Sequence, residues 1–321
     1  MPAPKVLITD YDFRDVELEL GIYRAAGVEV KTAQCRNEED VIREAEGCGG
    51  VLVQYAPINS KVLAARPEIR IASRYGAGFD TINTEDARRH GVWVANSPDY
   101  GVGEVATHAL GMALALLRHL PFYDRDVRAG KWHYLTPGSI KRAGDLTVGI
   151  LGLGRIGKRM AHLSRNAFAR VIACDPYIID GDFPAYVGRV DLEGLFREAD
   201  VISLHVPLND ETRGMVNARL LALMKRGSVL VNTARGAVVN VDDMLAALDA
   251  GMLDAAGLDV LPVEPPPAGH ALLAHPRILL TPHSAFFSVE AERELRRKAA
   301  ENIVDYFRTG RPKYVVVEGR T

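Results

Sequence analysis

The sequence predicts an α/β protein made of two doubly wound parallel-sheet domains with a cleft between them. Three observations predict this class. Apolar strand-like segments alternate with helix-like segments over the first hundred residues, a glycine-rich turn follows at residues 152–157, and the alternation then continues. Strands alternating with helices are typical of parallel sheets covered on both faces. A length of 321 residues also favours two domains.

The first domain is expected to contain five strands joined by four helices. The strands are predicted at residues 5–9, 28–32, 50–54, 69–74 and 92–95, and the helices at 14–25, 38–46, 59–65 and 82–90. Its first turn, residues 10–14, has acidic and aromatic residues where a phosphate loop would have glycines. Residues 101–106 match a loose G-x-G-x-x-A pattern, but no strand precedes them. We therefore interpret them as a linker into a helix at about 105–117.

The strongest ligand signal lies at residues 146–158. An apolar strand at 147–151 is followed by Gly152, Gly154 and Gly157 and then by a helical pattern. In a dinucleotide fingerprint these glycines permit the tight turn, the close approach of a pyrophosphate and close packing of helix on strand. Asp175 ends the next strand, about 20 residues further on, where an acid accepts from ribose hydroxyls and repels a 2′-phosphate. The pattern predicts NAD as cofactor rather than NADP.

The second domain continues in alternation. Further strands are predicted at 171–175, 201–206, 228–232, 255–260 and 278–280, with helices at 218–224, 241–250 and from 288 to Gly310. Residues 119–145, before the glycine turn, have weak periodicity and several aromatic residues. They are longer than a linker requires, so we expect an arm for oligomerisation or a packed surface loop.

Three polar residues follow predicted strands in the second domain, namely Arg235, Glu264 and His283. Because ligands bind at the carboxyl ends of parallel strands, we expect them on the same edge as the glycine turn. An imidazole suits proton transfer to a carbonyl oxygen, and a carboxylate bonded to it fixes its tautomer. A guanidinium holds a substrate carboxylate with paired donors. This combination predicts an enzyme that interconverts 2-oxo and 2-hydroxy acids.

The composition excludes several other classes. The net charge is −2 with both signs mixed, so no basic field attracts nucleic acid or an anionic membrane. The three cysteines lack metal-ligand spacing, and we expect neither a metal site nor a disulfide framework. Residues 1–5 show no signal-peptide pattern, and the apolar helix at 105–117 is too short to span a bilayer. We expect a cytoplasmic protein.

The chain resembles the D-isomer-specific 2-hydroxyacid dehydrogenase family over nearly its whole length. The motifs appear in family order: Arg74-Tyr-Gly-Ala-Gly-Phe-Asp80, the turn at 152–157, Asn232-Thr-Ala-Arg-Gly236, Leu258-Asp-Val260, Glu264-Pro265 and Thr281-Pro-His-Ser-Ala285. The resemblance implies a flavodoxin-like, discontinuous substrate domain (1–102 and 288–321), a Rossmann NAD-binding domain (103–287) and a homodimer that uses the 119–145 arm.

The resemblance also implies roles for individual residues. Arg235, Glu264 and His283 would be the catalytic trio, and the substrate would contact Arg74, Phe286 and the backbone N–H groups of Tyr75, Gly76 and Ala77. The cofactor would contact the turn, the acid and several strand-end residues: Gly152, Gly154, Arg155, Ile156, Gly157, Asp175, His205, Val206, Pro207, Thr212, Thr233, Ala234, Arg235, Asp259 (to the nicotinamide amide) and His283.

Two departures leave the substrate open. The bulky Phe286-Phe287 pair and Arg74 look more like the C-terminal-binding-protein branch, which suggests either an apolar or aromatic 2-oxo acid or a purely structural Phe286. Residues 54–56 are Gln-Tyr-Ala, where phosphoglycerate dehydrogenases often place an arginine and a serine, so phosphoglycerate is disfavoured. The alternatives are an NAD(H)-sensing, corepressor-like binding protein and a dehydrogenase for another small anion such as formate or phosphite.

Overall fold

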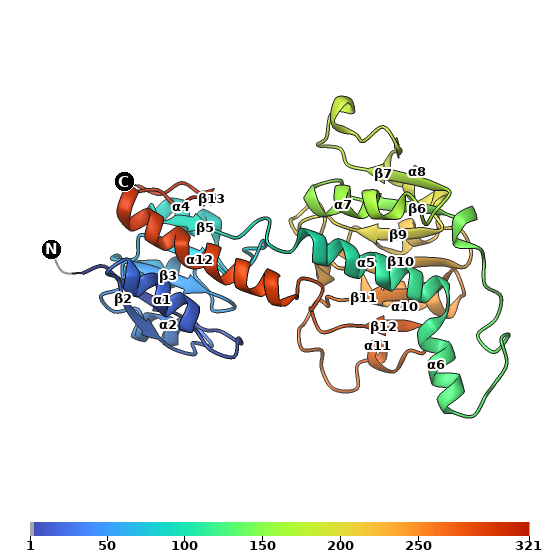
Figure 1. Ribbon diagram of the computed structural model, residues 1–321, viewed down its shortest axis with the longest axis horizontal. Coiled ribbons are helices and arrows are strands. Elements are labelled where there is room, and N and C mark those ends of the chain that lie inside the picture. The colour runs from blue at the N-terminus through green and yellow to red at the C-terminus, as the bar shows by residue number, and fades with distance from the viewer. Residues whose placement is uncertain (1–2, 321) are drawn as a thin grey trace. The chain divides into compact units, whose positions relative to one another are not determined.

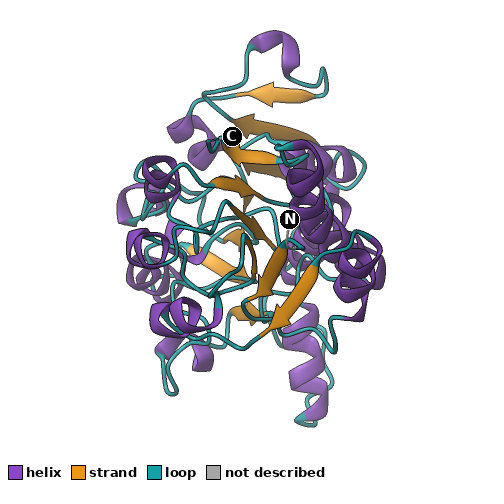
Figure 2. Ribbon diagram, turned by 90° about the vertical axis from the view of Figure 1, so that its left-hand side faces the viewer, coloured by secondary structure: helices purple, strands orange, loops and turns teal. Residues whose placement is uncertain are grey.

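The computed structural model describes residues 3–320, which fold into two compact α/β units. Unit 1 comprises residues 1–101 and 288–321, and unit 2 comprises residues 102–287. The sequence places the first boundary one residue later. Helices pack against the strands in both units, and Figure 2 shows helices on both sides of the strands, so the predicted α/β class with two sheet domains is confirmed.

Unit 1 is built on a six-stranded sheet in the order β13-β5-β4-β3-β1-β2. Its strands are β1 (Lys5–Ile8), β2 (Glu29–Thr32), β3 (Gly50–Val53), β4 (Ile71–Arg74), β5 (Trp93–Ala95) and β13 (Val315–Val317). The parallel order β2-β1-β3-β4-β5 is that of flavodoxin-like sheets, as predicted. The antiparallel edge strand β13 was not predicted. It is a three-residue apolar run with no turn that ties it to β5.

The helices of unit 1 are α1 (Glu17–Ala25), α2 (Glu38–Glu44), α3 (Ser60–Ala65), α4 (Thr84–His90) and α12 (Val289–Thr309). The last of them packs on α1, β3 and β4, and Figure 1 shows it as the long red helix of this unit. Local sequence explains where several helices begin. A side chain accepts a hydrogen bond from a backbone N–H in the first turn of four of these helices. The accepting residues are Asn37 for α2, Asn59 for α3, Asn83 for α4 and Ser288 for α12.

Unit 2 has a fully parallel, seven-stranded sheet in the order β12-β11-β10-β9-β6-β7-β8. This is the dinucleotide-binding strand order, extended by β12. The strands are β6 (Thr147–Leu151), β7 (Arg170–Cys174), β8 (Val187–Arg189), β9 (Val201–Leu204), β10 (Ser228–Asn232), β11 (Leu253–Leu258) and β12 (Ile278–Leu280). The helices are α5 (Val102–Leu117), α6 (Leu120–Arg128), α7 (Arg155–Ser164), α8 (Leu192–Glu198), α9 (Ala218–Leu221), α10 (Val241–Asp249) and α11 (Ala271–Ala274).

Alternation along the strands builds a core on each face of this sheet. Val148 and Ile150 of β6 join a cluster with α5 and α7, whereas Leu151 joins a second cluster with α8, α9 and α10. Gly149, also in β6, leaves no room for a side chain, because an added Cβ would lie 2.8 Å from the Cβ of Ala199. This close approach lets the segment after α8 pack directly on the strand that leads into the glycine turn.

The structure adds elements that the sequence did not predict. Residues 119–145 contain α6 and a 3-10 turn (Ala143–Asp145), and β8, α8 and α11 are also new. Only Val187 of β8 is buried, so this strand has no apolar alternation that would reveal it. Residues 101–106 include the start of α5, as expected, and no strand leads into them. Most predicted strands end within two residues of the observed bounds.

Candidate active site

The three glycines of the turn in unit 2 each occupy a different environment. Gly152 has φ +89°, a left-handed conformation that a side chain would strain. An added Cβ on Gly154 would meet nothing within 4 Å, whereas one on Gly157 would collide with the carbonyl oxygen of Gly152. Helix α7 begins directly after Gly154 without a side-chain cap, so its first N–H groups remain available to a ligand.

Asp175 follows β7 and is oriented by two backbone donors. Its carboxylate accepts from the N–H of Leu153 in the glycine turn at 2.8 Å and from the N–H of Tyr177 at 3.0 Å. An ionised carboxylate has about four acceptor positions, so further positions remain for hydroxyl donors. The acid is thereby fixed beside the turn, where the sequence predicts the adenosine ribose.

A cavity of about 610 Å³ opens between the glycine turn, the end of β7 and the loop after β9. This volume is in the range of small-molecule sites. Seven predicted cofactor residues line it: Gly152, Gly154, Asp175, His205, Val206, Pro207 and Thr212. Sequence reasoning missed others, among them Tyr177, Arg189, Glu211 and Met215. Tyr177 was detectable from its position two residues after the acid, but Arg189 belongs to the unpredicted strand β8.

The remaining predicted cofactor residues lie outside the lining of this cavity: Arg155, Ile156, Gly157, Thr233, Ala234, Arg235, Asp259 and His283. Among them, Thr233 has a buried hydroxyl with no hydrogen-bond partner within residues 3–320. A buried hydroxyl without a partner is costly, and a ligand hydroxyl or amide would satisfy it. Together with the open space at Gly154, this orphaned group fits a dinucleotide bound along the edge of the sheet.

His205 is positioned at the end of β9. Its Nε2 lies 2.9 Å from the hydroxyl of Ser203. Burial lowers the pKa of His205 to about 4, so the imidazole is neutral at physiological pH. This histidine is therefore suited to a structural or binding role in the cofactor groove and unsuited to proton transfer.

Arg235 follows β10 in extended conformation, with φ −146°. Asn232 holds the turn, since its side chain accepts from Ala234 N at 3.0 Å and donates to the carbonyl oxygen of Arg235 at 2.9 Å. An added Cβ on Gly236 would overlap the backbone of Leu261, so the loops after β10 and β11 pack against each other here. The loop with Arg235 is thus brought beside the loop that leads to Glu264.

Glu264 and His283 form a direct pair, with 2.6 Å between Oε2 and Nδ1. The other carboxylate oxygen of Glu264 accepts from Leu261 N at 2.7 Å. Burial by itself would raise the pKa of Glu264. The hydrogen bonds from His283 and Leu261, together with the positive charge of Arg235, outweigh burial and lower that pKa. The structure therefore places all three predicted catalytic residues in one group, with Glu264 ionised.

The His283 loop is held by Asp259, which is buried. The Asp259 carboxylate accepts from Thr281 Oγ1, from Ser284 N at 2.9 Å and from Ala285 N at 3.0 Å. His283 itself has φ +54°, unusual for a residue with a side chain, and its N–H donates to the carbonyl oxygen of Asp259 at 2.8 Å. The predicted contact of Asp259 with the nicotinamide amide stays a prediction. Its hydrogen-bond donors belong to the loop, and His108 Nε2 of α5 lies 3.8 Å from Oδ1.

Phe286 lies three residues after His283 and is half-buried. Its ring meets that of Phe287 edge to face, with 6.4 Å between the ring centroids, while Phe287 is exposed. The aromatic pair therefore consists of one partly buried ring and one exposed ring on unit 2. Whether Phe286 touches substrate stays a prediction.

In unit 1, the predicted substrate residue Arg74 ends β4, and the predicted substrate residues Tyr75, Gly76 and Ala77 form the loop that follows. The sequence expects the N–H of Tyr75 to face the substrate carboxylate. That expectation is wrong for this donor, because Tyr75 N already donates to the carbonyl oxygen of Val53 at 2.9 Å and so extends the β3–β4 pairing.

The other two loop residues are held through their carbonyl oxygens. Gly76 O accepts from Ser97 N at 2.9 Å, and Ala77 O accepts from the side-chain amide of Asn96 at 2.7 Å. Within residues 3–320, the N–H groups of Gly76 and Ala77 donate to no protein acceptor. They therefore remain candidates for anion binding. The Arg74 guanidinium lies against Gly76, where any Cβ would collide with it.

Two further properties concern the whole of the described chain. No helix within residues 3–320 is both long enough and apolar enough to cross a membrane. Across the same residues, no three His, Cys, Asp or Glu side chains gather to form a site for a metal ion.

The chain is similar to known proteins in family, sequence and structure. The family model described as D-isomer specific 2-hydroxyacid dehydrogenase, NAD binding domain, matches residues 110–285. A glyoxylate reductase from Korarchaeum cryptofilum (strain OPF8) is 36% identical over 265 residues, which cover 81% of this chain and 80% of the relative. A glycerate dehydrogenase from Methylorubrum extorquens is 33% identical over 286 residues, covering 87% and 88%.

A solved structure is similar over almost the entire chain. The NADPH-dependent glyoxylate/hydroxypyruvate reductase from Sinorhizobium meliloti, in complex with NADP and malonate, has a TM-score of 0.88 and 27% sequence identity over 99% of both chains. These proteins are all enzymes, which does not favour a binding protein without turnover. The chain therefore belongs to the D-isomer specific 2-hydroxyacid dehydrogenase family, and it is an NAD-dependent oxidoreductase that interconverts 2-oxo acids and D-2-hydroxy acids.

Proposed function

We propose that His283 is the acid/base group of this reaction, that Glu264 orients and stabilises it, and that Arg235 holds the substrate carboxylate. The observation that supports this assignment best is the 2.6 Å contact between His283 Nδ1 and Glu264 Oε2. This contact engages one ring nitrogen and leaves Nε2 to exchange a proton with a substrate. The positive charge of Arg235 helps to lower the pKa of Glu264.

Bound NADH supplies the hydride for the substrate carbonyl carbon. In this direction the imidazolium of His283 donates its Nε2 proton to the carbonyl oxygen, and in the opposite direction neutral His283 accepts that proton. The hydrogen bond to Glu264 fixes the orientation of the imidazole ring. The guanidinium of Arg235 provides paired donors for the carboxylate and positive charge beside the polarised carbonyl. We further propose that the N–H groups of Gly76 and Ala77 bind the same carboxylate.

The test is a His283→Ala substitution assayed with a panel of 2-oxo acids, including glyoxylate, hydroxypyruvate, pyruvate and phenylpyruvate. We expect kcat to fall about a hundred- to ten-thousand-fold while the Kd for NADH stays unchanged. His162→Ala, which alters an exposed histidine on α7, is the matched control and should keep full activity. Undiminished turnover by His283→Ala would refute the assignment.

The panel also decides the substrate side chain. Phe286 as a binding residue favours phenylpyruvate over glyoxylate, whereas Phe286 as a structural wall predicts no such preference. Formate or phosphite as the best substrate would support the alternative anion dehydrogenase.

We propose that the chain is a homodimer assembled through the arm at residues 119–145. Trp132 and Tyr134 on this arm are 87% and 73% exposed, and Leu120 and Leu135 are more than half exposed. Exposed aromatic clusters of this kind mark protein interfaces. Trp132→Ser should shift the mass measured by light scattering toward the monomer. A monomeric wild-type protein would contradict the proposal.

A cytoplasmic location is also proposed, supported by three unpaired, buried cysteines.

A further inference from the structure

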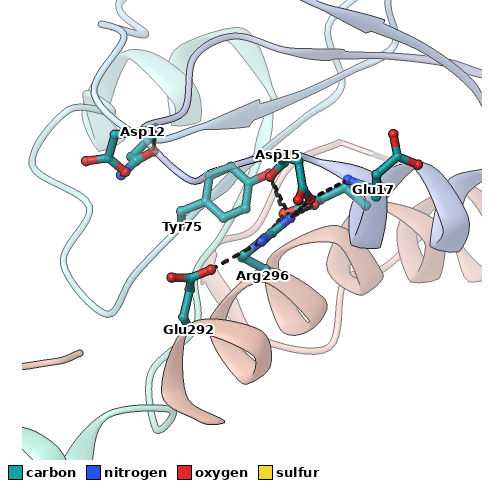
Figure 3. A network of polar contacts seen from close by, with 8 residues as sticks. Asp12, Asp15, Glu17, Tyr75, Glu292 and Arg296 are labelled. Carbon is teal, nitrogen blue, oxygen red and sulfur yellow. Dashed lines mark hydrogen bonds and ion pairs between the residues drawn. The ribbon is translucent and has the colours of Figure 1, made fainter. Parts of the chain in front are cut away.

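A buried polar network lies beside the loop that we propose for substrate carboxylate binding (Figure 3). Its centre is Glu19 of α1, which is 0% exposed. The Glu19 carboxylate accepts two parallel hydrogen bonds from the Arg296 guanidinium of α12, both at 2.8 Å. It also accepts a hydrogen bond from the Tyr75 hydroxyl at 3.0 Å. A residue of the substrate loop is thus bonded to a buried ion pair between two helices.

Arg296 also contacts residues other than Glu19. Its guanidinium donates to the carbonyl oxygen of Asp15 at 2.7 Å and to Glu292 one helical turn back at 3.2 Å. It lies 4.9 Å from the centre of the Phe13 ring. The same Phe13 ring meets Tyr75 edge to face, with 5.1 Å between centroids. Figure 3 shows the Tyr75 ring and the Arg296 side chain converging from different elements. The network therefore fixes both the ring and the hydroxyl of Tyr75.

Burial and the nearby charge of Glu19 raise the pKa of Tyr75 well above its usual value, so the hydroxyl remains a donor. A phenylalanine could also pack on Phe13 but would leave Glu19 without this donor. The neighbouring residue Tyr23 illustrates the contrast. Its hydroxyl is also buried in this region and has no hydrogen-bond partner within residues 3–320.

We propose that Glu19, Arg296 and Tyr75 form a positioning device for the substrate-carboxylate loop. The hydroxyl bond anchors the side chain of the residue that precedes Gly76 and Ala77, whose carbonyl oxygens are already held from the other side. With these contacts in place, the N–H donors of Gly76 and Ala77 are held in position for a substrate carboxylate. The inference rests on the proposed function. It concerns affinity for the substrate carboxylate and leaves proton transfer and NADH binding unaffected.

The test compares Tyr75→Phe with Tyr23→Phe, which removes the other buried hydroxyl. Each variant is assayed with the best 2-oxo acid and with its methyl ester, which lacks the carboxylate charge. We expect Tyr75→Phe to lower kcat/KM for the acid about fivefold or more, through KM, because the loop with the N–H groups of Gly76 and Ala77 loses its anchor. The ester and the Kd for NADH should change less than about twofold. Arg296→Lys keeps the charge but loses the paired donors, so we expect a smaller decrease of kcat/KM for the acid.

The outcomes separate the inference from the proposed function. A selective loss on the acid in Tyr75→Phe, absent from Tyr23→Phe, supports the positioning device. Equal losses on acid and ester, or no loss on the acid, overturn it while the function stands. A wild-type protein that reduces no 2-oxo acid on the panel rejects the proposed function and this inference with it.

Discussion

The two glycines at 154 and 157 allow cofactor binding to be separated from folding. Gly154 has φ −66° and ψ −162°, a conformation that alanine also adopts, and an added Cβ would meet no protein atom within 4 Å. Gly154→Ala should therefore stabilise the NADH-free protein by about 0.4–1 kcal/mol through the unfolded state. At about 2–4 °C per kcal/mol, Tm rises by about 1–4 °C. Gly154 lines the cavity beside the turn, so an added Cβ there should raise the Kd for NADH about tenfold or more.

Gly157→Ala is the matched variant for which we expect the opposite effect on stability. Its Cβ would collide with the carbonyl oxygen of Gly152, so α7 or the turn must shift. Overpacking of this kind costs about 1–3 kcal/mol, which lowers Tm by about 2–12 °C and also weakens NADH binding. Both variants are measured by calorimetry without NADH and by fluorescence titration with NADH. Unchanged NADH affinity in Gly154→Ala would refute the placement of the pyrophosphate at this turn, and an unchanged Tm in Gly157→Ala would refute the packing argument.

Two further predictions concern the cofactor cavity. Asp175→Ala should lower the ratio of kcat/KM with NADH to that with NADPH by about tenfold or more, because the charge that repels a 2′-phosphate is gone; an unchanged ratio would show that another residue selects the cofactor. For His205, burial lowers the pKa from 6.5 to about 4, so protonation favours the unfolded state. Its contribution to stability is complete above about pH 6.5 and is lost as pH falls toward 4, by at most about 3 kcal/mol. Urea unfolding of His205→Asn should therefore depend less on pH in this window than that of the wild type, and parallel curves would contradict the assignment.

The glycine turn was predictable because its physical requirements are local. A tight turn, an open backbone and a close helix–strand contact each require glycine at a fixed spacing, and all three occur within six residues. The convergence of Arg235, Glu264 and His283 was predictable for a different reason. In a parallel sheet every strand ends on the same edge, so residues far apart in sequence meet once the strands are identified.

Interactions that depend on one particular pairing were not predictable. Arg296 and Glu19 are 277 residues apart, and nothing in either helix indicates that the arginine on α12 faces the glutamate on α1. The pairing of β13 with β5 is of the same kind. The misassigned N–H of Tyr75 follows from a smaller cause, since β4 ends at Arg74 but its hydrogen bonding to β3 continues one residue further. Sequence periodicity does not resolve a single backbone bond.

The two acids after β11 show how neighbouring carboxylates acquire different roles. Asp259 is buried and accepts three hydrogen bonds from the loop that contains His283, so it fixes the backbone there. Glu264 is partly exposed and accepts from the imidazole itself, so it fixes the orientation and tautomer of the ring. The Asp259 side chain is only 1% exposed, and His108 Nε2 of α5 lies 3.8 Å from its Oδ1. Loss of Asp259 would thus disturb the backbone of the His283 loop, whereas loss of Glu264 would act on the imidazole alone.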